Sequence, residues 1–327
     1  MWHSTAAKLN DTNKPLRGGA PVVDDRTRVL FIGGYTRSGS TLLERVLARA
    51  DGYVACGEIR HLWREGLKEN RLCGCGAPFR ECGFWREVFN DAYGSMEALD
   101  PDEVLRLKES VDRFWRIPQI RRRALASPRR RADTTEYRSL LARLYESVRT
   151  VSGADVIIDS TKDSSHGHML STLESVDLDV VHLVRDSRAV AHSWQRKKYN
   201  PGGGREMDRY GLLRTALGWD ATNFLVGWLK SHARTYTRLR YEDFVDDPAG
   251  GTQGVYNAVG RFGATPALDD RRIELTPDHS VAGNPIRFKQ GPIEISHDEE
   301  WHRAMRGRSR ALVAAASWPG LKAYGFE

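Results

Sequence analysis

A short apolar run that leads into a glycine-rich turn constrains the fold of this chain more than any other feature. Residues 29–33 read Val-Leu-Phe-Ile-Gly, which is typical of a strand buried on both faces of a parallel sheet. The turn at 34–41 follows, and apolar residues then recur at helical spacing from Leu42 to Arg49. This order predicts a strand, a turn and a helix, with the turn at the carboxyl end of a parallel strand.

The rest of the chain repeats this alternation of strands and helices. Further strands are predicted at 155–159, 180–184 and 238–241, and residues 60–150 carry a mostly helical pattern. Because these elements alternate without an internal repeat, we predict a P-loop-like, three-layer α/β fold with a central, mainly parallel sheet. Residues 60–150 then form a helical insertion into that fold.

Two stretches have the composition of loops. Residues 1–27 are mostly polar and lack the apolar core of a signal peptide, so we predict a flexible arm followed by a single domain at 28–327. Residues 199–209 contain Pro201 and three consecutive glycines, which indicates a mobile loop. No apolar run approaches the roughly 20 residues of a membrane-spanning helix, and we therefore expect a cytoplasmic protein with no membrane span.

The charge of the chain favours an anionic ligand. The sequence has 50 Lys and Arg against 43 Asp and Glu, a net charge of +7, which suits a nucleotide, a phosphate or a sulfate. A dense basic cluster lies at 121–131, without the interleaved aromatic residues of a known nucleic-acid module. A solvated helix face or the wall of a substrate cleft explains this cluster, and we expect no nucleic-acid partner.

The turn at 34–41 has the chemistry of an anion-binding loop. It differs at one position from the phosphate-binding pattern G-x-x-x-x-G-K-[ST], because Ser40 stands where that pattern has lysine. Successive backbone N–H groups and the start of a helix still form a concave site for an anion. Arg37 adds a positive charge, and Ser40 and Thr41 add hydroxyl donors.

Two motifs together resemble those of sulfotransferases that use 3′-phosphoadenosine 5′-phosphosulfate (PAPS). The segment 36–43, Thr-Arg-Ser-Gly-Ser-Thr-Leu-Leu, resembles the family's 5′-phosphosulfate loop. The segment 181–193 is similar to the family's 3′-phosphate motif, in which an arginine after a strand precedes a serine by eight positions. Here these residues are Arg185 and Ser193, and about two helical turns separate them, so both can reach one phosphate.

Three shorter matches follow in the order that the family shows. Residues 240–243, Arg-Tyr-Glu-Asp, are similar to a Tyr-Glu-Asp step that implies a place for Tyr241 near the adenine and the 3′-phosphate. Residues 159–163 resemble a loop of tyrosylprotein sulfotransferases, which implies that Lys162 helps to bind the transferring sulfonate. Residues 283–289 resemble the closing segment of bacterial members, which returns a basic residue to the cofactor.

The chain also departs from the family pattern. Its loop lacks the lysine of many cytosolic members, and Arg37 takes that place as in the tyrosylprotein type. The tyrosylprotein enzymes carry a Gly-Glu-Glu step whose second glutamate is the base, whereas residues 57–59 here are Gly-Glu-Ile. Glu58 is therefore the first candidate for the general base. Histidines are the alternatives, namely His61, His166 and His168, whereas His192 is interpreted as structural.

The resemblance implies transfer of a sulfuryl group from PAPS to a hydroxyl or amine of a small-molecule, carbohydrate or lipid acceptor, with release of 3′-phosphoadenosine 5′-phosphate (PAP). It implies Arg37, Lys162 and Glu58 as catalytic residues, no required metal, and an acceptor side formed by 60–150. Asn284 is a further candidate contact, and nothing indicates an oligomeric state. The residues expected to bind the donor are Arg37, Ser38, Gly39, Ser40, Thr41, Leu42, Arg185, Ser193, Tyr241, Arg287 and Lys289.

Other functions are weighed against this one. A P-loop kinase or nucleotide triphosphatase would need magnesium and an acid at a strand end, for which Asp159 is available, but the loop lacks the lysine of those enzymes. A non-catalytic nucleotide-binding protein would not need both a phosphosulfate loop and a 3′-phosphate motif. An aryl sulfate donor would have nothing to place at the 3′-phosphate motif.

The four cysteines lie close together in the sequence, as Cys56, Cys73, Cys75 and Cys82. Such a group can bind a metal, with His61 as an extra ligand. Its C-x-C-x6-C spacing fits no common zinc motif, and Cys-Gly-Cys-Gly is also typical of a tight turn. We therefore interpret these residues as buried or turn thiols, and we predict neither a metal site nor, in a reducing compartment, a disulfide.

Overall fold

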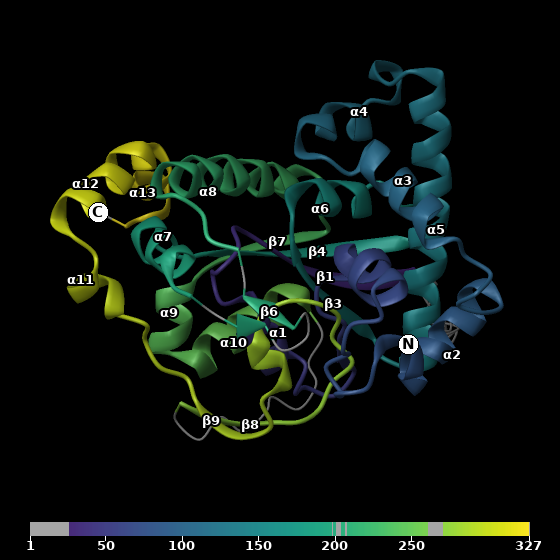
Figure 1. Ribbon diagram of the computed structural model, residues 1–327, viewed down its shortest axis with the longest axis horizontal. Helices are drawn as coiled ribbons and strands as arrows, with labels where there is room; N and C mark the ends of the chain where they lie inside the picture. The colour runs from purple at the N-terminus through teal and green to yellow at the C-terminus, as the bar shows by residue number, and fades with distance from the viewer. Residues whose placement is uncertain (1–25, 198, 201–203, 207, 261–270, 327) are drawn as a thin grey trace, which may run out of the picture.

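A five-stranded sheet forms the centre of the computed structural model, which describes residues 26–197, 199–200, 204–206, 208–260 and 271–326 (Figure 1). All five strands are parallel, and their order in the sheet is β2-β3-β1-β4-β7. They span Tyr53–Ala55 (β2), Val156–Lys162 (β3), Thr27–Gly33 (β1), Val176–Val184 (β4) and Thr235–Arg240 (β7). The predicted α/β fold with a mainly parallel sheet is confirmed.

Helices cover both faces of this sheet. Alternate residues of β1 point to opposite faces. Leu30 and Ile32 pack in one cluster with α1 (Ser40–Leu47), α9 (Tyr241–Asp246) and α10 (Pro248–Val259). Val29 and Phe31 pack in a second cluster with the helices of the insertion and with α6 (Ser164–Leu170). The two apolar faces of the central strand therefore explain the three layers.

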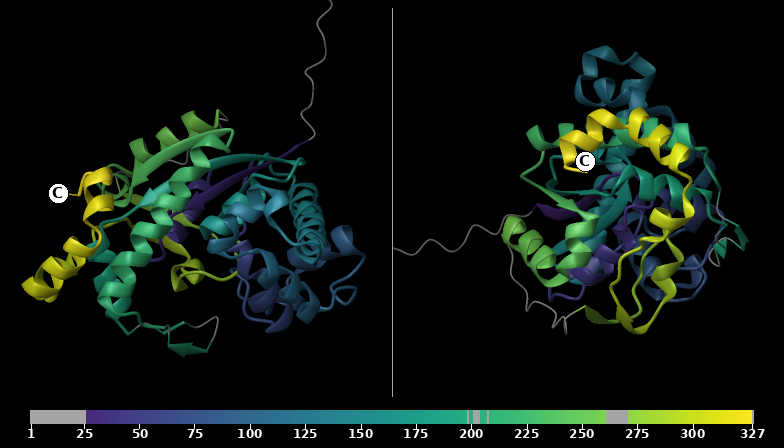
Figure 2. Two further views of the ribbon diagram at one scale, coloured as in Figure 1. Left: turned by 90° about the horizontal axis from the view of Figure 1, so that it is seen from above. Right: turned by 90° about the vertical axis from the view of Figure 1, so that its left-hand side faces the viewer.

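The predicted helical region between β2 and β3 is helical along most of its length. It contains a π-helix at Leu62–Lys68 and four α-helices at Gly83–Tyr93 (α2), Pro101–Val111 (α3), Ile117–Arg121 (α4) and Pro128–Ser152 (α5). The longest of them begins where the Ser127 side chain accepts a hydrogen bond from the Arg130 N–H, and it ends at Gly153 in the left-handed conformation. Figure 2 shows this region at the opposite end of the molecule from the C-terminal helices.

The remaining helices follow β4 and β7. They are α7 (Ser187–Gln195), α8 (Leu212–Gly227), α11 (Glu300–Ala304), α12 (Gly307–Ala316) and α13 (Trp318–Tyr324). Two antiparallel hairpins accompany them, β5 (Tyr199–Asn200) with β6 (Arg205–Glu206), and β8 (Arg272–Leu275) with β9 (Gly291–Glu294). The first hairpin lies within the predicted loop 199–209. The prediction of a loop therefore missed a short antiparallel strand pair. The predicted N-terminal arm lies outside the described residues up to position 25.

The motif-bearing loops meet at one edge of the sheet. Strands β1, β3 and β4 are adjacent and parallel, and they end at Gly33, Lys162 and Val184. The pairing of β1 with β3 is irregular near its end, since Phe31 faces Asp159 but Gly33 faces Lys162. The extra residue in β3 is a bulge, a feature that re-aims a side chain next to a site. In the described part of the chain, no helix is long and apolar enough to cross a membrane.

Candidate active site

The loop between β1 and α1 is held in its shape by two glycines that contact other motifs. Gly34 has a φ of 149°, and a Cβ there would lie 2.2 Å from the Leu183 carbonyl oxygen of β4. Gly39 has a φ of 89°, and a Cβ there would lie 2.5 Å from the Tyr241 ring. Both positions therefore require glycine. The close approaches bring the loop against β4 and against the start of α9.

Some charged and hydroxyl groups of this loop have no hydrogen-bond partner among the described residues. Arg37 has a φ of 71°, and its guanidinium lies over the Trp194 ring, 4.9 Å from the centroid. Its Nη1 and the Ser38 Oγ are buried, and neither has a hydrogen-bond partner among the described residues. Burial and the nearby Arg196 lower the pKa of the Arg37 guanidinium. Buried donors of this kind without a partner favour an anionic ligand.

Arg185 lies at the end of β4 and faces the same space. Its guanidinium lies over the Tyr241 ring at 4.6 Å, and its Nη1 donates to the Arg37 carbonyl oxygen at 3.1 Å. The Trp219 indole N–H donates to the Arg185 carbonyl at 2.9 Å and fixes the backbone. Arg185 Nε is buried, and the described residues offer it no acceptor. Ser193, two turns into α7, lines the same cavity.

Asp298 lines the cavity and contacts Arg185, and the sequence analysis did not identify it. One of its carboxylate oxygens lies 3.3 Å from Arg185 Nη2 and 2.6 Å from Arg196 Nη2. Burial raises the pKa of Asp298, but the two arginines outweigh burial and hold that pKa below its ordinary value. A carboxylate therefore occupies an anion-binding position between two arginines. Its sequence neighbourhood at 296–300 gives no motif that would have identified it.

Glu58 and Lys162 form an ion pair on the other side of the cavity. Lys162 Nζ lies 2.5 Å from Glu58 Oε1 and also donates to the Ser160 carbonyl at 3.0 Å. The φ of Lys162 is 73°, a strained value that goes with the bulge at the end of β3. His61 Nε2 lies 3.6 Å from the other Glu58 oxygen. Burial lowers the pKa of His61, and Glu58 opposes that effect in part.

A buried carboxyl group connects the loops that carry this pair. Glu44 of α1 accepts hydrogen bonds from the Gly57 N–H and from the Ser160 hydroxyl, both at 2.6 Å. Complete burial raises the pKa of Glu44 to about 8. Glu44 therefore positions the residues before Glu58 and before Lys162. In the sequence, Glu44 stands beside Arg45 and between apolar residues of the helix, a pattern that gave no sign of a buried carboxyl group.

These residues surround one cavity with a volume of about 420 Å³. Ten of the predicted site residues line it, namely Arg37, Gly39, Ser40, Thr41, Leu42, Glu58, Lys162, Arg185, Ser193 and Tyr241. A second cavity of about 620 Å³ shares Arg185, Tyr241 and Asp298 with the first. The two cavities are therefore neighbours along Arg185, Tyr241 and Asp298.

Three residues expected to bind the donor do not line the cavity: Ser38 is buried in the glycine loop, and Arg287 and Lys289 lie elsewhere. Arg287 is 2% exposed, and its guanidinium donates to the carbonyl oxygens of Ser280 and Leu72, both at 2.6 Å. Lys289 is exposed, and neither residue lines the cavity. The segment still reaches the site at Gly283, whose Cβ would lie 3.1 Å from Glu58 Oε1, and at Asn284. The structure thus gives Arg287 a structural role instead of a ligand contact.

The other candidate acids and bases are engaged away from the cavity. Asp159 is buried and accepts hydrogen bonds from the hydroxyls of Tyr145 at 2.6 Å and Thr161 at 2.5 Å. His166 Nε2 lies 3.1 Å from the same Asp159 carboxylate. Burial lowers the pKa of His168 to about 4, and its Nε2 is 3.1 Å from the Leu225 carbonyl. These contacts leave Glu58 and His61 as the candidate bases that line the cavity.

The fold and site define an α/β protein with two cationic positions, at Arg37 and at Arg185, along one cavity. The chain belongs to the sulfotransferase family, since the model of that family matches residues 30–261. The resemblance of the motifs to sulfotransferases is thereby confirmed, and family membership supports transfer of a sulfuryl group.

Two solved structures are similar to this chain. One is a sulfotransferase domain from the curacin biosynthetic pathway, with 14% identity, a TM-score of 0.43, and coverage of 88% of this chain and 95% of that one. The other is the sulfotransferase domain of the Synechococcus PCC 7002 olefin synthase, with 19% identity, a TM-score of 0.47, and coverage of 90% and 96%. No curated protein matches the sequence.

Proposed function

We propose that this protein transfers a sulfuryl group from PAPS to a hydroxyl or amine of a polar acceptor and releases PAP. The observation that carries the proposal is the pair of cationic positions along one cavity. Arg37 lies at the glycine loop, Arg185 lies at the end of β4, and Ser193 lies two turns into α7 on the same cavity. PAPS has an anionic group at each end of its ribose, a 5′-phosphosulfate and a 3′-phosphate, so it matches two separated anion sites better than ATP does.

The donor-binding groups have free hydrogen-bonding capacity for this ligand. The Ser38 hydroxyl, Arg37 Nη1 and Arg185 Nε are buried, and no acceptor for them occurs within the described ranges. The start of α1 at Ser40 directs its first N–H groups toward the loop, where a phosphate is favoured. Asp298 holds Arg185 at 3.3 Å. We expect a 3′-phosphate to displace that carboxylate, because a phosphate carries more charge and accepts more hydrogen bonds.

The chemistry follows that of phosphoryl transfer, with positioning and charge stabilisation as the main contributions. The bond between sulfur and the bridging oxygen breaks, its electron pair stays on that oxygen as PAP leaves, and the acceptor atom forms the new bond to sulfur. Arg37 and the loop amides stabilise the charge that develops on the bridging oxygen. Lys162 binds sulfonate oxygens.

Glu58 serves as the general base in this proposal. Its carboxylate lies 2.5 Å from Lys162 and lines the cavity, so a bound sulfonate and the acceptor would both lie within its reach. When Lys162 turns to the sulfonate, Glu58 is released to take the proton from the acceptor. His61, 3.6 Å from Glu58, can share that proton.

The acceptor side of the cavity favours a polar substrate. The cavity lining also includes the charged side chains Glu65, Arg71, Glu206 and Asp208. Glu65 and Arg71 form an ion pair at 3.0 Å, and Glu206 and Asp208 are exposed. A polyhydroxyl acceptor can form hydrogen bonds with such groups, whereas an apolar acceptor cannot. Among the classes that the family resemblance allows, a carbohydrate or another polyhydroxyl compound matches this lining best.

The test is transfer of label from PAPS labelled in its sulfur to pooled acceptors, separated by class into sugars, amines, phenols and lipids. We expect transfer without magnesium, strongest for the polyhydroxyl pool, and a large loss in Glu58→Gln. Transfer of phosphate from ATP with magnesium, and none of sulfur from PAPS, would contradict the proposal.

A further inference from the structure

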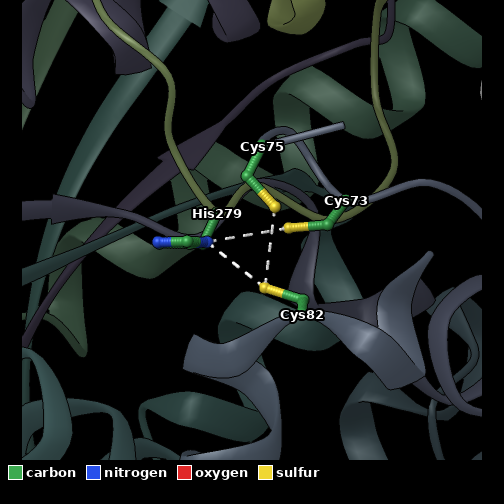
Figure 3. A group of neighbouring side chains, drawn as sticks. All are labelled: Cys73, Cys75, Cys82 and His279. Atoms are coloured by element: carbon green, nitrogen blue, oxygen red, sulfur yellow. Dashed lines mark hydrogen bonds between the residues drawn. The ribbon is translucent and has the colours of Figure 1, made fainter. Parts of the chain in front are cut away.

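Three cysteines and one histidine come together on the side of the helical insertion (Figure 3). Cys73, Cys75 and Cys82 lie in and after the turn that precedes α2, and His279 lies 197 positions after Cys82. Their ligand atoms, three Sγ atoms and one ring nitrogen, all lie within 4.8 Å of one another. Figure 3 shows the three sulfur atoms and the His279 ring directed at one common space.

The distances between these atoms match the edges of a tetrahedral zinc site. Zn–S bonds of about 2.3 Å and Zn–N bonds of about 2.0–2.1 Å at tetrahedral angles place two sulfurs about 3.8 Å apart, and a sulfur and a nitrogen about 3.5 Å apart. The Cys75 and Cys82 sulfurs are 3.7 Å apart. His279 Nδ1 lies 3.3 Å from the Cys82 sulfur and 4.0 Å from the Cys73 sulfur.

We propose that Cys73, Cys75, Cys82 and His279 bind one Zn²⁺ ion as a structural site. Three thiolates and one imidazole are a ligand set that zinc prefers, and four protein ligands leave no position for a substrate. Cys73 and Cys82 are buried free thiols, as the sequence interpretation had them. The fourth group in the cluster is His279, whereas His61, weighed as an extra ligand, lines the donor cavity. Cys56 is not part of the cluster.

The surrounding residues fix the ligands as supporting residues do in metal sites. The His279 ring stacks on Phe84 at 4.7 Å and 12°, and the His279 carbonyl accepts a hydrogen bond from the Trp85 indole at 2.8 Å. The turn that carries Cys73 is closed by the bond from the Gly76 N–H to the Cys73 carbonyl at 2.9 Å. These contacts support the His279 ring and the turn at Cys73, and the proposed ion would join the two segments that carry them.

Two further contacts join the segments on which the ligands lie. The Gly74 N–H donates to the Ser280 carbonyl at 2.9 Å. Arg287 donates to the carbonyls of Leu72 and Ser280, which are the residues next to Cys73 and His279. A Cβ at Gly74 would lie 2.3 Å from an Asp278 carboxylate oxygen, so only glycine allows this close approach. The buried guanidinium also offsets the net negative charge of a zinc ion with three thiolates.

The proposed ion would connect the insertion to the donor cavity. The segment that carries His279 continues into Gly283, Asn284 and Ile286, which line that cavity. The backbone of Val281 exchanges hydrogen bonds with Cys56 and Glu58 on the way, at 2.9 Å and 2.7 Å. Zinc at the cluster would therefore hold a wall of the donor site in place without contacting the reacting atoms.

A disulfide is the competing use of these thiols. None of the four cysteines is in a disulfide in the structure. A disulfide would use two of the three clustered sulfurs. It would leave the third thiol and the His279 imidazole without a role. The converging geometry of all four groups favours a metal over a covalent bond.

The test is metal analysis of the full chain, purified under reducing conditions with zinc supplied. We expect one zinc per chain and an X-ray absorption spectrum with three sulfur neighbours at about 2.3 Å and one nitrogen at about 2.0 Å. Cys75→Ser and His279→Ala should lower zinc content several-fold. Their matched controls, Cys56→Ser and His302→Ala, change a cysteine and a histidine outside the cluster and should keep it.

Two results would overturn the proposal. One is a wild-type chain without stoichiometric zinc after reconstitution. The other is a disulfide among Cys73, Cys75 and Cys82 in the native protein, seen by mass spectrometry. Since both use the wild-type chain, they decide the question even if a variant does not fold. Neither depends on sulfuryl transfer, so zinc binding and the proposed activity can fail separately.

Discussion

The donor cavity and the cysteine–histidine cluster share the chain segment 278–289, but they obtain their rigidity from different sources. The cavity lies at the edge of a parallel sheet, and its loops are fixed by strand pairing, by close contacts at Gly34 and Gly39, and by Glu44. The cluster joins an irregular turn to an irregular C-terminal segment, with few backbone hydrogen bonds between them.

This difference has a physical consequence for ligand dependence. A site at the edge of a sheet is positioned before its ligand binds, and its unpaired donors then provide affinity. A cluster between two loops needs the ion itself to supply the free energy of ordering, as structural zinc sites do. The cavity should therefore tolerate loss of its ligand, whereas the cluster should not. Substitutions at the two regions should therefore have different effects on activity, stability and donor binding.

Glu58→Gln should produce the largest loss of activity. Removal of a general base lowers the rate by about 10²- to 10⁴-fold, while the sheet keeps the cavity intact. Single-turnover transfer from labelled PAPS measures the rate, and calorimetric titration with PAP measures binding. PAP affinity should change little. A variant with wild-type turnover would show that another group takes the acceptor proton.

Removal of zinc should affect stability first and donor binding second. Treatment with a chelator under reducing conditions should lower the melting temperature by about 3–5 °C, because a loss of about 2–3 kcal/mol shifts the midpoint of a domain of this size by about 1.5 °C per kcal/mol. PAP affinity should also fall, since the cavity wall at 283–286 is tied to His279. Re-addition of zinc should restore both the melting temperature and the PAP affinity. Cys56→Ser, treated in the same way, is the matched control and should respond like the wild type. Unchanged PAP affinity in the metal-free protein would show that the cluster does not influence the donor cavity.

Glu44→Gln should change the pH dependence of stability more than the activity. The pKa of Glu44 is raised to about 8 in the folded chain, above the ordinary value of a glutamate, so the protonated form is favoured by folding. Its contribution is fully present below the unfolded pKa and is lost as pH rises toward and through 8. Glutamine resembles the protonated acid, so the free energy of unfolding should fall less between pH 5 and 8 than in the wild type. Parallel denaturation curves over that range would contradict the role of Glu44.

Asp298→Asn should have the smallest effect, and in the opposite direction. The Asp298 carboxylate competes for Arg185 and Arg196 with the proposed 3′-phosphate. Partly exposed ion pairs contribute about 0.2–1 kcal/mol, so PAP affinity should rise by about 1.5- to 5-fold. Titration with PAP and with 5′-AMP measures this, and the gain should appear for PAP only. A loss of PAP affinity would instead make Asp298 part of the binding site.

The sequence predicted those parts of the molecule whose signal is local. The strands at 27–33, 156–162 and 176–184 contain the short apolar runs on which the predictions at 29–33, 155–159 and 180–184 rested, and their loops carry contiguous motifs. Strand β2 and the β8–β9 hairpin were missed because three or four residues give too little periodicity.

The residues that the sequence analysis missed depend on contacts between distant segments. Asp298, Glu44 and His279 acquire their roles from packing between segments that are far apart in the sequence. Arg287 shows the converse, because a basic residue at a matching motif position turned toward backbone carbonyls instead of the cavity. A motif fixes the residue type at a position, but neighbouring segments decide which atoms it contacts.

Recognition of a 3′-phosphate by Arg185 is the central claim, and titration with PAP against 5′-AMP in the wild type and in Arg185→Ala tests it most directly. The two ligands differ only in the 3′-phosphate. We predict that the wild type binds PAP more tightly than AMP, and that Arg185→Ala loses about 10- to 100-fold in PAP affinity, as removal of charged hydrogen bonds implies, with little change for AMP. Equal affinities for PAP and AMP in the wild type, or equal losses for both in the variant, would contradict the account.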